Sequence, residues 1–149
     1  MREKIRQALN EAMKSRDAAR VSTLRMVSAT IKDRDIAARG DGIGAADDAA
    51  LVAVLAKMIR QREESATAFQ DAGRAELADK ERAEIEVIRA FMPAQMAGEA
   101  VEAAVRAAIA ETGASSAREM GRVMAMLKSR HAGLMDFGKA SALVKTLLA

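Results

Sequence analysis

Residues 93–148 decide the fold, and they read PAQMAGEAVEAAVRAAIAETGASSAREMGRVMAMLKSRHAGLMDFGKASALVKTLL. The segment opens with Pro93, the only proline in the chain, and contains three short segments of helical apolar periodicity separated by glycines. A proline disfavours helix at the residue before it, so a helix arriving from the N-terminal side ends there. We therefore expect a domain boundary at Pro93 and three helices after it.

Local signals set the ends of these three helices. The first is expected over about residues 98–112 and ends at the C-cap signal Gly113. The motif SARE at residues 116–119 matches a capping box, in which the serine and glutamate side chains reciprocally bind free amides. It predicts the start of the second helix, which Gly133 ends. Asp136 is the expected N-cap of the last helix.

Four longer helices are predicted in front of Pro93. Three glycines within residues 39–44 end the second of them, and this loop lacks the Gly-Lys-Ser/Thr ending of a phosphate loop. No segment shows the alternation of a strand. The predicted fold class is all-α, with an N-terminal four-helix domain over residues 1–92 and a C-terminal three-helix domain over residues 93–149. The four N-terminal helices are expected over about residues 2–16, 17–38, 48–72 and 75–91.

Composition excludes several classes of protein. The chain has no cysteine, which removes disulfides, thiolate nucleophiles and cysteine-ligated metals. No window approaches 18 consecutive apolar residues, so neither a membrane span nor a signal peptide is expected. Three phenylalanines, ten methionines and abundant alanine indicate a thin core of closely packed helices. A cytoplasmic protein fits these features.

The net charge of +3 conceals an uneven distribution. Residues 1–39 carry 10 basic and 5 acidic side chains, residues 40–117 carry 8 and 14, and residues 118–149 carry 6 and 2. Two basic ends therefore flank an acidic middle. A basic segment can contact phosphate, and it can equally be a solvated helix face.

The densest group of carboxylates lies on the fourth predicted helix. Acid–base catalysis would need one of them buried, with a shifted pKa. The neighbouring cations favour instead a salt-bridged helix surface, in which Lys80 pairs with Glu84 four residues further on. Arg82 is predicted to pair with Glu86 in the same way.

His131 is the only histidine, and no His-x-x-x-His or Glu-x-x-His spacing accompanies it. Its place at a helix end favours contact with terminal carbonyl groups. Nucleophile motifs are also absent. No catalytic residue, metal ligand or cofactor is therefore predicted.

Basic residues concentrate on the last two predicted helices. Packing these helices together would place several cations near two helix N-termini, an arrangement that holds phosphates through charge and free backbone amides. The scarcity of aromatic side chains argues against reading of single-stranded bases, which leaves recognition of folded RNA by shape and backbone. A helix-turn-helix DNA reader is an alternative. The predicted RNA contacts are Arg118, Arg122, Lys128, Arg130, Lys139 and Lys145.

Several short motifs occur in a fixed order along the chain. The N-terminal motifs are Arg25-Met26, Ile31-Lys32, QREES at residues 61–65, AGR at 72–74 and Phe91-Met92-Pro93. The C-terminal motifs are GAS at residues 113–115, MGRVM at 120–124 and LVK at 143–145. Together these motifs resemble the YqeY family, and the C-terminal part also resembles the tail domain of the GatB subunit of the transfer-RNA-dependent amidotransferase.

The resemblance implies a cytoplasmic two-part helical protein. Since the GatB tail is thought to help hold transfer RNA, it suggests RNA contacts at Arg122, Lys128, Lys139 and Lys145. The chain departs from the family at Ala125, where glycine is common, and in the loop at residues 132–138, which lacks an expected basic residue.

The large GatB domain that amidates the aminoacyl group has no counterpart in this chain. We therefore expect a non-catalytic module that binds transfer RNA or another structured RNA. One alternative is an adaptor that binds an amidotransferase or translation protein through an exposed apolar patch on the N-terminal helices. Another is an accessory to a carbon–nitrogen ligase that uses glutamine as amide donor.

Overall fold

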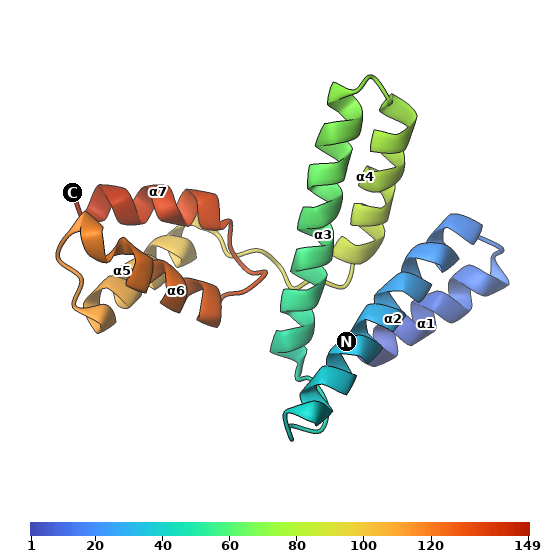
Figure 1. Cartoon of the computed structure of the whole chain (residues 1–149), viewed down its shortest axis with the longest axis horizontal. Helices are drawn as coiled ribbons and strands as arrows, with labels where there is room; N and C mark the ends of the chain where they lie inside the picture. The colour runs from blue at the N-terminus through green and yellow to red at the C-terminus, as the bar shows by residue number, and fades with distance from the viewer. The chain divides into compact units, whose positions relative to one another are not determined.

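The computed structural model describes all of residues 1–149, and it consists of helices and connecting turns (Figure 1). Seven α-helices and one short 3₁₀ turn are present and there is no strand, which confirms the predicted all-α class. The elements are α1 (Arg2–Lys14), α2 (Ala18–Gly40), α3 (Asp48–Asp71), α4 (Ala75–Arg89), α5 (Gly98–Thr112), η1 (Ala117–Glu119), α6 (Met120–Arg130) and α7 (Phe137–Leu147).

The chain divides into two compact units, Met1–Met92 and Pro93–Ala149. We call them unit 1 and unit 2. Each contains buried apolar side chains that pack with one another inside that unit. Each unit is therefore described by itself.

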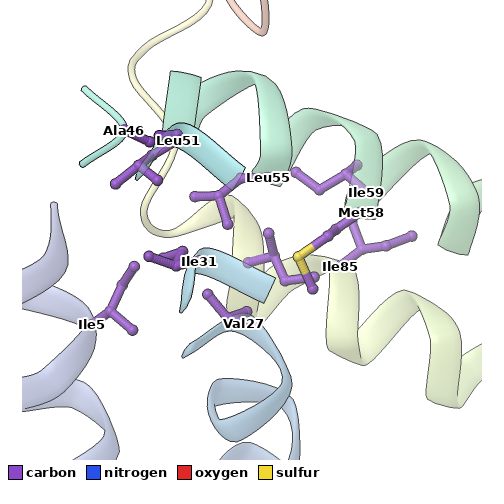
Figure 2. Close-up of a cluster of buried hydrophobic side chains, with 11 residues drawn as sticks. Ile5, Val27, Ile31, Ala46, Leu51, Leu55, Met58, Ile59 and Ile85 are labelled. Carbon is purple, nitrogen blue, oxygen red and sulfur yellow. The ribbon is translucent and has the colours of Figure 1, made fainter. Parts of the chain in front are cut away.

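Unit 1 consists of two helical hairpins. Figure 1 shows α1 beside α2 and α3 beside α4, and α2 also packs against α3 and α4. In Figure 2, the side chains of Val27 and Ile31 from α2 face Leu55 and Met58 from α3. Burial of such side chains stabilises a fold by about 1.5–3 kcal/mol each. The core of unit 1 thus lies where the two hairpins meet.

Three aspartates cap helices, and Asp136 is the one predicted above. The carboxylate of Asp17 accepts the backbone N–H of Arg20 at 3.1 Å at the start of α2. Asp47 caps α3 through the N–H of Ala50, at 2.8 Å. These bonds satisfy amides that have no partner within their helices. Asp136 caps α7 in the same way, through the N–H groups of Gly138 and Lys139.

Unit 2 packs α5 against both α6 and α7. Gly113 ends α5 with φ of 67°, which confirms the predicted C-cap, since glycine adopts this left-handed conformation without steric cost. The predicted capping box is wrong in its serine half. The Ser116 side chain makes no capping bond, and a 3₁₀ turn rather than an α-helix begins there. The fully buried side chains of unit 2 include Val105, Val123, Leu127, Ala140 and Val144.

Candidate functional site

The six predicted RNA-contacting residues lie on three consecutive elements of unit 2. Arg118 lies in η1; Arg122, Lys128 and Arg130 lie on α6; and Lys139 and Lys145 lie on α7. All six side chains belong to exposed residues. Their partners divide them into two groups.

Arg122 contacts the end of the preceding helix. Its guanidinium donates to the backbone oxygen of Thr112 at 2.7 Å and to Glu119 at 3.4 Å. A cation at the last carbonyl groups of a helix complements the helix dipole, so Arg122 stabilises the C-terminus of α5. Glu119 also accepts the backbone N–H of Ser115 at 2.8 Å, and this hydrogen bond lowers the pKa of the Glu119 carboxyl.

Arg130 forms a two-pronged ion pair with Glu111 of α5. Its two terminal nitrogens donate to the two carboxylate oxygens at 2.9 and 2.6 Å. The hydrogen bonds from Arg130 lower the pKa of the Glu111 carboxyl. Arg122 and Arg130 therefore each join α6 to α5, and sequence spacing gave no sign of either contact.

The other four cations make no side-chain hydrogen bond or ion pair within the protein. Lys139 and Lys145 are six residues apart on α7, which places them about 120° apart around the axis and about 9 Å apart along it. They lie on different faces of the helix, a geometry that suits separate phosphates better than one shared anion. The four unpaired cations are Arg118, Lys128, Lys139 and Lys145.

His131 caps the end of α6 through its backbone, whose N–H donates to the carbonyl oxygen of Leu127 at 2.9 Å. The residue is half-buried. No group of three or more His, Cys, Asp or Glu side chains is arranged to hold a metal ion.

Unit 1 contains a buried arginine whose role the apolar periodicity of α3 does not explain. Arg62 is 8% exposed and donates to Glu84 of α4 at 3.0 Å and to the Met26 sulfur of α2 at 2.7 Å. A third bond goes to the backbone oxygen of Met58. Arg62 thus joins three helices. The predicted Lys80–Glu84 pair is wrong, because Glu84 faces α3.

The predicted Arg82–Glu86 pair is also wrong. Arg82 pairs with Asp79 at 3.1 Å, and Glu86 pairs with Arg89 at 3.0 Å. These contacts are three residues apart rather than four, a spacing that brings side chains equally close on a helix. The predicted salt-bridged surface of α4 is present, with different partners.

Two concavities lie on unit 1. The larger, about 500 Å³, is at the turn between α1 and α2 and is lined by Met13, Arg16, Ala18, Val21, Ser22 and Arg25. The second, about 390 Å³, lies between α3 and α4 and is lined by Glu63, Arg82, Ala83, Ile85, Glu86 and Arg89.

Large apolar side chains are exposed only on unit 1. Ile36 and Ile43 are each more than 60% exposed, and Met13 and Met26 are each more than 40% exposed. Leu77 of α4 is 38% exposed. None of the helices combines the length and apolarity needed to cross a bilayer.

The fold defines an all-helical protein of two compact units, the second of which exposes unpaired cations. A family model described as "Yqey-like protein" matches residues 2–148. The chain therefore belongs to the YqeY family, as its motifs predict.

Curated relatives come from several yeasts, and each is named "Altered inheritance of mitochondria protein 41, mitochondrial". The protein from Eremothecium gossypii is 36% identical over 103 residues, which cover 69% of this chain and 55% of that protein. The one from Lachancea thermotolerans is 32% identical over 88 residues, covering 59% of this chain and 46% of that protein. The chain spans about half the length of the curated relatives it matches.

These names contradict the expectation of a cytoplasmic protein, because each relative is named a mitochondrial protein. That expectation depended on the family resemblance and on the lack of cysteine. A chain without cysteine cannot form disulfides, but this property does not identify one compartment.

Proposed function

We propose that this YqeY-family protein is a non-catalytic module that binds structured RNA, with transfer RNA as the first candidate. The observation that carries the proposal is the set of unpaired cations on unit 2, namely Arg118, Lys128, Lys139 and Lys145. Cations free of internal partners are available to neutralise phosphates.

The charge balance of the segment supports the same proposal. Residues 118–149 carry six basic and two acidic side chains. Glu119 pairs with Arg122, and Asp136 caps α7, so neither carboxylate pairs with an unpaired lysine. The positive charge of this segment is therefore left facing solvent.

The contacts that the six cations make within the protein narrow the set that we propose for RNA binding. Arg122 and Arg130 stabilise unit 2 through α5, so replacing either changes the fold as well as the charge. Lys128, Lys139 and Lys145 carry no such structural contact. We assign the phosphate contacts to these lysines, with Arg118 as a further contact.

Binding of purified protein to total transfer RNA across a salt series tests the proposal. The triple variant Lys128→Gln/Lys139→Gln/Lys145→Gln is expected to bind at least about tenfold more weakly at low salt. Each lost phosphate contact also lowers the slope of log K against log salt by roughly 0.7–0.9.

A matched control removes the same charge from unit 1. Lys4, Lys32 and Lys57 are exposed and make no ion pair, so their replacement by glutamine changes net charge equally. This control is expected to retain most of the affinity. If both triple variants lose equal affinity, the binding depends on overall charge and the assigned contacts are wrong.

A further inference from the structure

We propose that the larger concavity of unit 1 is a docking site for an acidic segment of a partner protein that inserts one apolar side chain. We call it the α1–α2 site. It goes beyond RNA binding, because it lies in the other unit and has a different chemistry. Its lining residues are Met13, Arg16, Ala18, Val21, Ser22 and Arg25.

The α1–α2 site is lined by both apolar and cationic side chains. Met13 and Val21 supply apolar surface, and Arg16 and Arg25 supply the charge. All six lining residues are exposed or half-exposed. A small-molecule pocket buries most of its ligand, whereas this open concavity of about 500 Å³ suits a side chain that protrudes from a larger partner.

The two arginines that line the site are unpaired. Arg16 and Arg25 make no side-chain hydrogen bond or ion pair in the protein, and the nearby carboxylate of Asp17 caps α2. Lys14 and Arg20 add positive charge beside the turn, and Glu11 is the other acidic residue near it in sequence. The unpaired arginines therefore complement carboxylates on a partner.

In the second concavity of unit 1, carboxylates of the protein itself neutralise the arginine side chains. Arg82 there pairs with Asp79, and Arg89 pairs with both Glu63 and Glu86. Two arginines line each concavity, but only those of the α1–α2 site lack carboxylate partners. This difference selects the α1–α2 site as the docking surface.

The backbone at Arg16 gives an independent argument. Its φ is 58°, a left-handed conformation that strains residues with a Cβ atom. The chain uses glycine at its five other positive-φ positions, which are Gly42, Gly44, Gly73, Gly113 and Gly133. At Arg16 alone it keeps a side chain where glycine would relieve strain. We infer that the guanidinium has a use outside the fold.

The apolar lining residues favour a protein partner over RNA. Met13 is 43% exposed, and methionine adapts its shape to varied apolar partners. A phosphate backbone would engage the arginines and leave Met13 and Val21 uncovered. An acidic segment with one apolar anchor covers both parts of the surface.

Anisotropy measurements with a labelled amphipathic helical peptide test the proposal. The peptide carries leucines along one face flanked by glutamates, and the full chain is titrated at low salt. We expect micromolar affinity, reduced about tenfold by Arg16→Gly and further by Arg16→Gly/Arg25→Gln. The melting temperature of Arg16→Gly is expected to equal or exceed that of the wild type, since strain is removed. Lower affinity with undiminished stability distinguishes a binding role from a structural one.

The controls are chosen to separate alternative occupants. Arg89→Gln, in the second concavity, is expected to leave affinity for the peptide unchanged, and replacing the peptide's glutamates by glutamines is expected to abolish binding. The proposal is overturned if the wild type fails to bind the acidic peptide at about 1 mM. It is also overturned if Arg16→Gly/Arg25→Gln binds the peptide as the wild type does, or if a structured RNA, and not the peptide, requires these arginines.

Discussion

The two units differ in whether charged side chains are buried and in whether apolar side chains are exposed. Unit 1 buries Arg62 among three helices and exposes Met13, Met26, Ile36 and Ile43 to solvent. Unit 2 buries no charged residue and exposes no large apolar side chain, while four of its cations face solvent unpaired.

This difference indicates how each unit holds together and what its surface can bind. Hydrophobic burial joins the three helices of unit 2 together with the contacts of Arg122 and Arg130 to α5, and the other four cations of its last two helices and η1 remain available to an anionic partner. In unit 1, Arg62 forms an ion pair with Glu84 within the α3–α4 hairpin and a hydrogen bond to Met26 of the other hairpin. The apolar side chains left outside provide surface for a protein partner.

The largest expected effect is the loss of a core leucine from unit 2. Leu127 is 1% exposed, so Leu127→Ala should destabilise this unit by about 3 kcal/mol, because a cavity replaces well-packed side-chain atoms. Urea denaturation followed through amide resonances of α5–α7 measures the loss. Leu55→Ala is the matched variant of unit 1, and a loss below about 1 kcal/mol in either would contradict the assigned core.

The second effect tests the ion pair of unit 1. Arg62→Ala should cost about 2–3 kcal/mol, because it leaves the partly buried Glu84 without its partner. The double variant Arg62→Met/Glu84→Leu should recover most of this loss, since apolar side chains replace both charges. Denaturation of all three variants measures the difference. If Arg62→Ala and the double variant are destabilised equally, the loss of stability in Arg62→Ala does not come from breaking the ion pair.

A smaller effect is expected at the junction of α5 and α6. Arg122→Ala should cost about 0.5 kcal/mol, because the bond to the Thr112 carbonyl is lost from a largely exposed side chain. Lys128→Ala on the same helix has no such contact and is the control. Hydrogen exchange at the C-terminal turn of α5 should increase in Arg122→Ala only.

The smallest expected effect is a dependence of the melting temperature on pH. Hydrogen bonds from Arg130 lower the pKa of Glu111, and those from Ser115 lower the pKa of Glu119. A lowered pKa in the folded state contributes stability above the unfolded pKa, and this contribution is lost as pH falls through the folded pKa. Glu111→Gln and Glu119→Gln should therefore have lower melting temperatures than the wild type at neutral pH. In acid, the variants and the wild type should melt at the same temperature. If the difference in melting temperature persists in acid, the substitutions act through packing and not through the charge of the carboxylates.

Local signals in the sequence predicted most of the fold. Pro93 lies in the connection between α4, which ends at Arg89, and α5. Asp17, Asp47 and Asp136 cap three helices through side chains within three residues of the amides they bind. Such signals act over a few residues, so they can be identified without knowledge of the packing.

Long-range partners could not be predicted in this way. Arg62 and Glu84 are 22 residues apart, and Glu111 and Arg130 are 19 apart. Which cations remain free for a partner depends on these contacts, and therefore on tertiary packing. Arg62 stands at helical spacing from the buried apolar residues Met58 and Ala66 of α3. A charged residue at such a position was the one available sign of a buried ion pair.

The most direct test of this division of surfaces compares two variants that each remove two positive charges. Affinity for transfer RNA is measured across a salt series for Lys128→Gln/Lys139→Gln and for Arg16→Gly/Arg25→Gln. Our account predicts weaker binding and a lower salt slope for the unit 2 variant, with near wild-type behaviour for the unit 1 variant. The reverse pattern, or equal losses in both, would contradict it.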